Sequence, residues 1–291
     1  MKITITGASG YIGSALCSRA KARAEPGSSA LSIQAIDLLL GDDITTKATQ
    51  DKIVSFRPDV IVNLAALSGE SACRLDTPRA ECVNAEAVYT LKSACPTARF
   101  IQASTASVLS NTGKYHTPYA WTKTTAEKEL LRWNNALVLR FGTVFGACSD
   151  LSATHRWDTP INKMFRDGVE KGEIEITGPG KWRPWVWLDS LVELLFQVMT
   201  GPDLSADHPV PVCEFNLPIG VVANRIAQEI AWLKHPYPRV VVREGPDADP
   251  RDYRMFPRHF GAHKEENTLF FGLHVWKRLL ARLKQDTKVA V

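Results

Sequence analysis

The chain has 291 residues, 45% hydrophobic and 23% charged, with a formal net charge of +4. This size and composition are typical of a globular protein with a large core, and so small a charge does not favour nucleic acid as a partner. No apolar run approaches the roughly 20 residues of a membrane-spanning helix, and a predicted strand begins at once, so we expect no membrane contact and no signal peptide. The six cysteines form no CxxC pair and the seven histidines lack metal-ligand spacing. We therefore expect free thiols, no metal and a cytoplasmic location.

Short β-branched runs alternate with helical patterns through the first half of the chain. Strands are predicted at 2–6, 32–36, 59–63, 100–104 and 136–141, and helices at 12–23, 46–56, 80–95 and 120–133. This alternation indicates an α/β fold, a Rossmann-like doubly wound parallel sheet. Ligands of such sheets bind beyond the carboxyl ends of the strands. The residues predicted to lie at that edge are Gly7, Asp37, Ala65, Ser104 and Gly142.

The regular alternation ends after about residue 147. Helices are predicted at 160–171, 188–199, 221–234 and 274–285, between short strands and Pro-rich loops. We expect residues 1–147 to form the Rossmann-like domain, with the ligand-binding edge just described. Residues 148–291 are expected to form a smaller mixed α/β lobe, mainly for substrate, with some segments that return to the first domain.

A glycine-rich stretch follows the first predicted strand and opens the first helix. Its first glycine permits the tight turn, the second lets the backbone approach phosphate, and the third lets helix and strand pack closely. The pyrophosphate of a dinucleotide then meets the amide groups of the helix N-terminus. The cofactor-binding residues expected here are Gly7, Gly10, Tyr11, Ile12 and Gly13.

Two acidic residues follow the second predicted strand. Asp37 ends that strand, where a carboxylate can accept hydrogen bonds from both ribose hydroxyls and repel a 2′-phosphate, so the sequence favours NAD over NADP. Asp43 and Ile44 are expected to hold the adenine, the carboxylate on its amino group and Ile44 against the ring. An ordinary helix cap before Thr45 is the alternative for Asp43.

Tyr119 and Lys123 lie four residues apart in a predicted helix, hence on one face. A nearby ammonium favours the tyrosinate and lowers the pKa of Tyr119, so that its oxygen can exchange a proton with a substrate hydroxyl while hydride leaves or enters the carbon. Thr105, at the end of an apolar run, is expected to donate a hydrogen bond to the same substrate oxygen. Thr105, Tyr119 and Lys123 are the predicted catalytic residues, and Tyr119 and Lys123 also adjoin the cofactor.

With these motifs the chain resembles the extended short-chain dehydrogenases/reductases, the NAD-dependent nucleotide-sugar epimerase and dehydratase family. Further matching segments are 63–66, 83–84, 139–146 and 183–189. The resemblance implies that Leu64, Ala65, Ala66, Asn84 and Val144 contact the cofactor. It also implies that the substrate is bound by Thr105, Thr143, Asn162 and Arg183, with Arg243 or Arg251 on its diphosphate.

The chain departs from the family pattern just after Thr105. Relatives that dehydrate or decarboxylate sugars carry an acid there, whereas this chain has Ala106 and Ser107. Because that carboxylate is the usual base beside the ketone, the sequence argues against a dehydratase or a decarboxylase. The short interval from Thr105 to Tyr119 also leaves the identity of the sugar open.

The leading hypothesis is an NAD-dependent epimerase of a nucleotide-activated sugar, which oxidises a ring hydroxyl transiently. The alternative is an NAD(P)-dependent keto-sugar reductase or small-alcohol dehydrogenase with the same catalytic residues. A dinucleotide-sensing regulator is a third hypothesis, and the retention of Tyr119 and Lys123 argues against it. The expected partner is a small molecule, and we leave open whether the chain forms a homodimer.

Overall fold

The computed structural model describes residues 1–23, 31–110, 117–202, 206–243, 252–255 and 273–289. By the contacts between its Cα atoms the chain divides into two compact units. The first unit consists of Met1–Phe141 and Leu191–Pro211, and the second of Gly142–Ser190 and Val212–Val291. The chain thus leaves the first unit after residue 141 and returns to it for a single segment.

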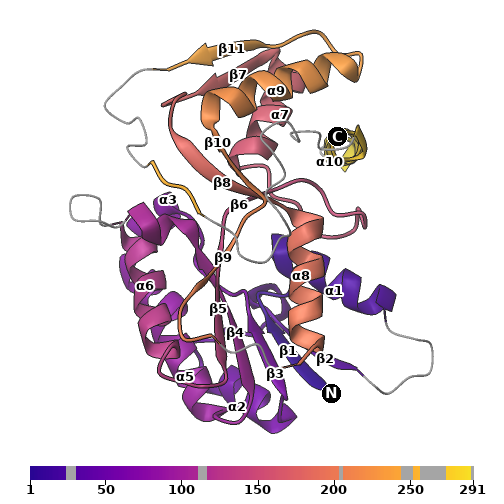
Figure 1. Ribbon diagram of the computed structural model, residues 1–291. Helices are drawn as coiled ribbons and strands as arrows, with labels where there is room; N and C mark the ends of the chain where they lie inside the picture. The colour runs from indigo at the N-terminus through magenta and orange to yellow at the C-terminus, as the bar shows by residue number, and fades with distance from the viewer. Residues whose placement is uncertain (24–30, 111–116, 203–205, 244–251, 256–272, 290–291) are drawn as a thin grey trace. The chain divides into compact units, whose positions relative to one another are not determined.

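A six-stranded sheet with the order β2-β1-β3-β4-β5-β9 forms the centre of the first unit (Figure 1). Its strands are β1 (Lys2–Thr6), β2 (Ser32–Ile36), β3 (Val60–Asn63), β4 (Arg99–Thr105), β5 (Ala136–Phe141) and β9 (Val210–Val212). The first five strands pair in parallel. The strand order reverses between β1 and β3, which is where open α/β sheets bind their ligands. The predicted Rossmann-like parallel sheet is confirmed.

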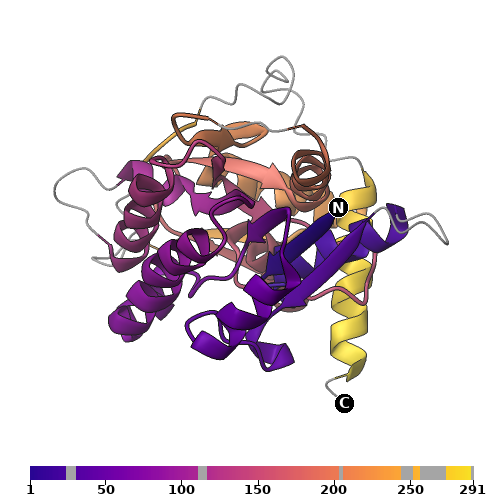
Figure 2. The ribbon, with the colours of Figure 1, turned by 90° about the horizontal axis from the view of Figure 1, so that it is seen from below.

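Helices cover both faces of this sheet. For this reason every residue of β3 is buried, and the strand shows no alternation of buried and exposed positions. Figure 1 shows α2, α5 and α6 on one side and α1 and α8 on the other, and Figure 2 shows α5 and α6 side by side. Their bounds are α1 (Tyr11–Arg23), α2 (Lys47–Phe56), α5 (Ala87–Ala94), α6 (Pro118–Leu130) and α8 (Leu188–Thr200).

The helix predicted at 80–95 corresponds to a continuous helical stretch whose middle turn is π-helical. It consists of α4 (Thr77–Glu81), a π-helical segment η2 (Cys82–Glu86) and α5. A π-helical turn inside an α-helix commonly marks a functional position, and η2 contains Asn84. Three further short helices, which the periodicity does not predict, are η1 (Leu38–Leu40), α3 (Glu70–Leu75) and η3 (Ala106–Ser110).

The second unit contains two small sheets. In the three-stranded sheet, β8 lies between β10, with which it pairs antiparallel, and β6, with which it pairs parallel. The two-stranded sheet pairs β11 with β7 in parallel. The strands are β6 (Thr143–Phe145), β7 (Glu173–Ile176), β8 (Trp182–Trp187), β10 (Phe215–Pro218) and β11 (Arg239–Val242).

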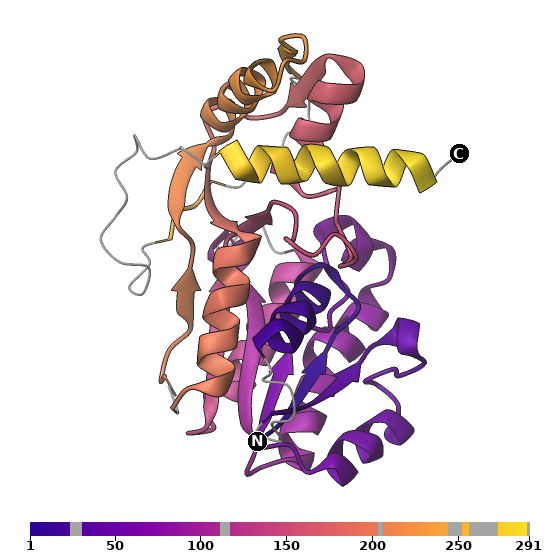
Figure 3. The same ribbon diagram turned by 90° about the vertical axis from the view of Figure 1, so that its right-hand side faces the viewer.

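Three helices pack around these sheets and around a core rich in aromatic residues. They are α7 (Pro160–Lys171), α9 (Ile219–Trp232) and α10 (Leu273–Val289), and Figure 3 shows the long α10 next to the other two. Phe165 of α7 and Trp276 of α10 stack with ring centroids 5.6 Å apart. Trp185 of β8 is fully buried in the same core. No helix in the described part of the chain is long and apolar enough to cross a membrane.

Candidate active site

The glycine-rich turn between β1 and α1 is closely packed. Gly7 has a φ of +68°, which disfavours any residue with a side chain, and a Cβ on Gly7 would lie 2.7 Å from the Ala65 nitrogen. A Cβ on Gly13 would lie 2.0 Å from the Gly7 oxygen. The amide of Gly10 donates to that same oxygen at 3.1 Å. Only hydrogens fit at Gly7 and Gly13, and this keeps the N-terminus of α1 close to the end of β1, as a dinucleotide pyrophosphate requires.

Asp37 lies directly against this turn. Its Oδ2 accepts a hydrogen bond from the Ser9 amide at 3.0 Å, and its Oδ1 accepts one from the Leu39 amide at 2.9 Å. An ionised carboxylate has about four acceptor sites, so these two bonds leave capacity for ribose hydroxyls. The structure therefore brings Asp37 and the glycine turn together.

Asp43 and Ile44 have partners within the protein. Asp43 accepts hydrogen bonds from the amide and hydroxyl of Thr45, and its Oδ2 pairs with Arg79 at 2.6 Å. Burial raises the pKa of Asp43, but the bonds from Thr45 and Arg79 outweigh burial and hold that pKa below its usual range. Ile44 is 4% exposed and belongs to the hydrophobic core. Contact of either residue with adenine stays a prediction.

The segment after β3 is fixed by a buried asparagine. The side chain of Asn84 accepts from the Leu67 amide at 2.9 Å, donates to the Leu67 oxygen at 3.1 Å and donates to the Thr122 hydroxyl at 3.2 Å. Leu64, Ala65 and Ala66 lie between β3 and this clamp. Asn84 thus ties the predicted cofactor-lining segment to α6, while its own contact with the cofactor stays a prediction.

The helix α6 begins two residues earlier than predicted. The hydroxyl of Thr117 accepts from the Ala120 amide at 3.2 Å, and Pro118 takes the first helical position, which suits a residue without an amide hydrogen. Tyr119 is therefore in the first turn of α6. Lys123 follows one turn later on the same face.

Lys123 is one of two buried lysines of the described first unit, the other being Lys92. The side chain of Lys123 is buried, with 3% exposure, and its Nζ donates to the Ala103 carbonyl oxygen of β4 at 3.1 Å. Burial lowers the pKa of Lys123 to about 8, against the opposing influence of Cys73 and Glu127. The ammonium is still mostly charged at neutral pH, but in a site where its charge is weakly screened.

Glu127 anchors α6 one turn beyond Lys123. This buried carboxylate accepts from the Ser104 hydroxyl at 2.6 Å and pairs with Arg140 through two bonds of 2.6 and 2.9 Å. Ser104 is on β4 and Arg140 on β5. The bidentate pair holds the helix that carries Tyr119 and Lys123 onto β5, and the bond from Ser104 holds it onto β4.

Thr105 ends β4 and leads into η3. Its Oγ1 accepts a hydrogen bond from the Ser107 amide at 3.1 Å. Because that bond uses an acceptor site, the hydroxyl proton remains available for donation to another oxygen. Ala106 and Ser107, the two residues after Thr105, are buried.

The second unit holds the remaining predicted site residues. Thr143 and Val144 are half-buried in β6, opposite Trp185 and Val186 of β8. Asn162 is fully buried, and its side chain bonds the Gly146 amide at 2.8 Å and the Arg156 oxygen at 2.9 Å. These bonds make Asn162 a bridge between backbone segments.

The three candidate arginines differ in setting. Arg183 is 5% exposed, donates to the Trp182 oxygen at 2.7 Å and lies 5.0 Å from the ring centroid of Tyr253. Arg243 is exposed and pairs with Glu175 and Glu173. Arg251 lies outside the described residues. The prediction that Arg183, Arg243 or Arg251 binds substrate remains open.

The family model of the NAD dependent epimerase/dehydratase family matches residues 3–212, which include the glycine turn, Asp37 and the Tyr119–Lys123 helix. The chain belongs to this family. The predictions of an NAD-dependent enzyme of the extended short-chain dehydrogenase type, and of NAD as its cofactor, are thereby confirmed. No curated protein sequence matches the chain.

Solved structures with the same fold have low sequence identity to this chain. UDP-glucose 4-epimerase from Thermus thermophilus, solved with NAD, aligns with a TM-score of 0.74 at 18% identity over 98% of this chain and 99% of that one. MoeE5 with UDP-glucose and NAD gives 0.70 at 20% identity over 100% of both chains. A dTDP-4-dehydrorhamnose reductase from Clostridium acetobutylicum gives 0.67 at 17% identity over 84% of each chain.

The motifs assign no role to several residues around Lys123, although Asn63 and Arg140 lie in the matching segments 63–66 and 139–146. Glu127 and Arg140 carry the anchor of α6, and Asn63 and Gln102 are fully buried amides on β3 and β4. A sequence signal existed for Gln102, because an amide inside an otherwise apolar strand must find a buried partner. Among the described residues, no group of three or more His, Cys, Asp or Glu is placed to hold a metal ion.

Proposed function

We propose that the protein is an NAD-dependent epimerase of a nucleotide-activated sugar. The observation that carries the proposal is the buried ammonium of Lys123, one helical turn from Tyr119 and held at 3.1 Å by the Ala103 oxygen. A desolvated cation beside a tyrosine supports proton exchange at the phenolic oxygen near neutral pH. The glycine turn and Asp37 in the same unit supply a cradle for NAD.

The catalytic roles follow from these positions. Tyr119 takes the proton from a ring hydroxyl of the sugar and later returns it to the resulting carbonyl oxygen. Lys123 stabilises the negative charge on Tyr119, and Thr105 donates a hydrogen bond to the reacting sugar oxygen through the proton that its bond with Ser107 leaves available. NAD held by the glycine turn and Asp37 would supply a reversible hydride acceptor for the sugar carbon.

The chain's own residues favour epimerisation over elimination. Ala106 and Ser107 follow Thr105 and supply no carboxylate. Without a base next to the ketone, removal of a proton from the adjacent carbon is not assisted, and the keto-sugar is left to accept hydride again. The two units then divide the work, the first binding NAD and the second binding the sugar nucleotide.

Two observations support a nucleotide sugar as the substrate. Two proteins of the same fold, the Thermus epimerase and MoeE5, act on or bind UDP-glucose, as their names state. In this chain Arg183 offers a guanidinium that the Tyr253 ring and the Trp182 oxygen hold in place. A preorganised planar guanidinium suits a diphosphate.

The test is incubation of the NAD-loaded protein with UDP-, dTDP- and GDP-hexoses, with the sugar products resolved by NMR and NADH followed at 340 nm. We expect interconversion of two epimers of one nucleotide sugar without steady-state release of NADH. Lys123→Met should abolish the conversion, whereas the matched control Lys128→Met, on the exposed side of the same helix, should not.

Two results would contradict the proposal. NADH that accumulates in proportion to product would assign a net dehydrogenase or, in reverse, a keto-sugar reductase. Tight NAD binding with no conversion of any nucleotide sugar would favour a dinucleotide sensor instead.

A further inference from the structure

Three polar side chains form one row across the centre of the parallel sheet. Thr6 of β1 is in register with Asn63 of β3, and Asn63 is in register with Gln102 of β4. All three are 0% exposed. On the flanking strands the row continues with Ile36 and Val138, both buried and apolar. The row is therefore polar only on the three strands next to the reversal of strand order.

Every polar atom of these three side chains has a partner. The Ala65 amide donates to Thr6 Oγ1 at 3.3 Å, and the Thr6 hydroxyl donates to Asn63 Oδ1. Asn63 Nδ2 donates to Gln102 Oε1 at 2.8 Å, and Gln102 Nε2 donates to the Ala103 oxygen at 2.8 Å. The donors all point the same way along the chain of bonds, an arrangement in which each bond polarises the next.

The row ends at the Ala103 carbonyl oxygen, which is also the acceptor for the Lys123 ammonium. The Ala103 oxygen receives both the Gln102 amide at 2.8 Å and Lys123 Nζ at 3.1 Å. Buried amides cost free energy unless they are paired, and the pairing in this row is completed only by the oxygen that also accepts from Lys123.

We propose that Gln102 is a positioning residue for Lys123. Its amide, oriented by Asn63, fixes the Ala103 carbonyl and so the place of the ammonium next to Tyr119. The same bonds connect the ammonium to the Ala65 amide, in the segment predicted to line the cofactor. This inference rests on the proposed role of Lys123 in catalysis.

The first test replaces Gln102 by a side chain of similar length without polar atoms, Gln102→Met. We expect kcat for the nucleotide sugar to fall about 10-fold, the size of one lost hydrogen bond. KM and the Kd for NAD should stay within about twofold, because neither ligand touches Gln102 in this scheme. The acid limb of the kcat–pH profile should move to higher pH, because a displaced ammonium stabilises the tyrosinate less.

A second variant, Gln102→Glu, keeps the length and the acceptor for Asn63 but replaces the Nε2 donor. At neutral pH its carboxylate cannot donate to the Ala103 oxygen, so kcat should fall as in Gln102→Met. As the pH decreases and the buried carboxyl takes up a proton, the ratio of variant to wild-type kcat should rise towards one. Because protonation of a buried carboxyl also restores stability, the recovery counts for the inference only where urea unfolding shows the variant folded at both pH values.

The matched control is Thr4→Val, which removes a fully buried hydroxyl of the same sheet, bonded to Gln34 at 2.8 Å and outside the row. It should leave kcat and the pH profile unchanged. A readout independent of turnover is the NMR signal of 13Cε-labelled lysine in the NAD-loaded protein, with Lys123 assigned by its loss in Lys123→Met. Gln102→Met should shift this signal and its titration midpoint, and Thr4→Val should not.

An unchanged Lys123 signal together with wild-type kcat and pH profile in both Gln102 variants would overturn the inference while leaving the proposed function standing. If instead the wild type converts no nucleotide sugar, the proposed function fails. The lysine signal then still decides whether Gln102 positions the ammonium.

Discussion

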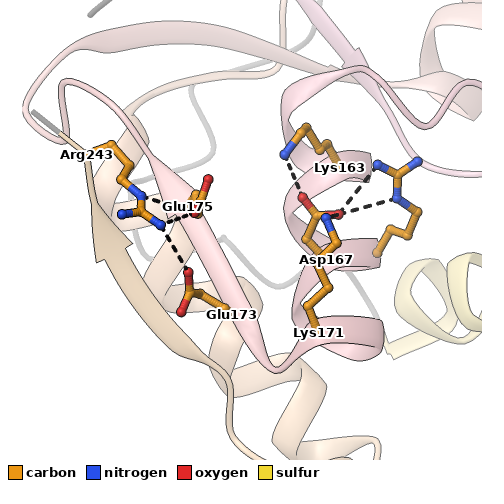
Figure 4. A network of polar contacts seen from close by, with 7 residues as sticks. Lys163, Asp167, Lys171, Glu173, Glu175 and Arg243 are labelled. Carbon is orange, nitrogen blue, oxygen red and sulfur yellow. Dashed lines mark hydrogen bonds and ion pairs between the residues drawn. The ribbon is translucent and has the colours of Figure 1, made fainter. Parts of the chain in front are cut away.

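Lys123 in the first unit and Asp167 in the second are both buried charged side chains, but their partners differ. Lys123 donates to a neutral backbone carbonyl, that of Ala103. Asp167 of α7 is 4% exposed and has three cationic partners, Lys163 at 2.5 Å, Lys171 at 3.1 Å and Arg166 at 3.4 Å. Figure 4 shows Lys163, Lys171 and Asp167 together on one helix.

The pKa values record this difference. Burial lowers the pKa of Lys123 to about 8, so the fold disfavours its charge. Burial also raises the pKa of Asp167, but the hydrogen bonds and charges of Lys163 and Lys171 outweigh it, and the pKa lies below its usual range. A buried charge whose partner is a neutral carbonyl costs stability, whereas a buried charge among opposite charges costs less or contributes to stability, and in the proposed function the first kind is kept for its effect on Tyr119. The same contrast predicts where substitutions affect turnover and where they affect folding.

The largest effect is expected in the first unit, at Tyr119. Tyr119→Phe should lower turnover of the nucleotide sugar roughly 100-fold or more, the scale of general acid–base catalysis. Calorimetric titration should give a near-normal Kd for NAD. The control is Tyr89→Phe, a half-exposed tyrosine of α5. Normal turnover by Tyr119→Phe would show that Tyr119 is not the acid–base group.

In the second unit, we expect Arg183 to bind the substrate and Arg243 to have a structural role. Arg183→Ala should weaken substrate binding roughly 10- to 150-fold, the loss of one charge-assisted hydrogen bond, and leave NAD affinity almost unchanged. Arg243→Ala should change neither, because its guanidinium already pairs with Glu175 and Glu173 across β11 and β7 (Figure 4).

Isothermal titration of both ligands decides this comparison. A matching loss of NAD affinity in Arg183→Ala would place that arginine in the cofactor site. An effect of Arg243→Ala on substrate alone would assign the diphosphate role to Arg243.

A smaller effect, in the first unit again, concerns the choice of cofactor. NAD should bind at least roughly tenfold more tightly than NADP, because the Asp37 carboxylate accepts ribose hydroxyls and repels a 2′-phosphate. The bonds from Ser9 and Leu39 hold that carboxylate in place. Titrating both dinucleotides by calorimetry measures the ratio, and equal affinities would exclude Asp37 as the selecting residue.

The two units also differ in how far the sequence predicts them. In the first, the strands at 2–6, 32–36 and 136–141 are confirmed residue by residue, because β-branched runs there end at turn residues. The π-helical turn at η2 has no signal in helical periodicity, and its Asn84 side chain bonds Leu67. Fold class and motif order follow from local pattern, whereas the burial of Lys123 depends on strands and helices distant in the chain.

For the second unit, the sequence predicts helix 160–171 as the structure has it, but the settings of its site residues depend on long-range contacts. Arg243 meets Glu175 only because β11 pairs with β7, across 68 residues of sequence. Asn162 bonds two backbone segments that no motif links to it. A family resemblance identifies such residues, but it does not show which hydrogen-bond or ion-pair partners their polar atoms already have.

The smallest expected effect tests the compensated charge. Asp167→Asn should lower the free energy of unfolding at pH 7 by about 1 kcal/mol, because the partners of Asp167 are partly exposed and screened. Since the pKa of Asp167 is lower in the folded state, its contribution is full above the unfolded value of about 3.9 and is lost as the pH falls through the folded value. Urea unfolding at pH 7 and at about pH 3 should therefore show a smaller difference at the lower pH. The control is Asp51→Asn, which removes an exposed carboxylate from the same i,i+4 arrangement with Lys47 on α2 and should change stability little at either pH. Equal losses in the two variants would mean that burial among three cations gives Asp167 no advantage over a surface pair.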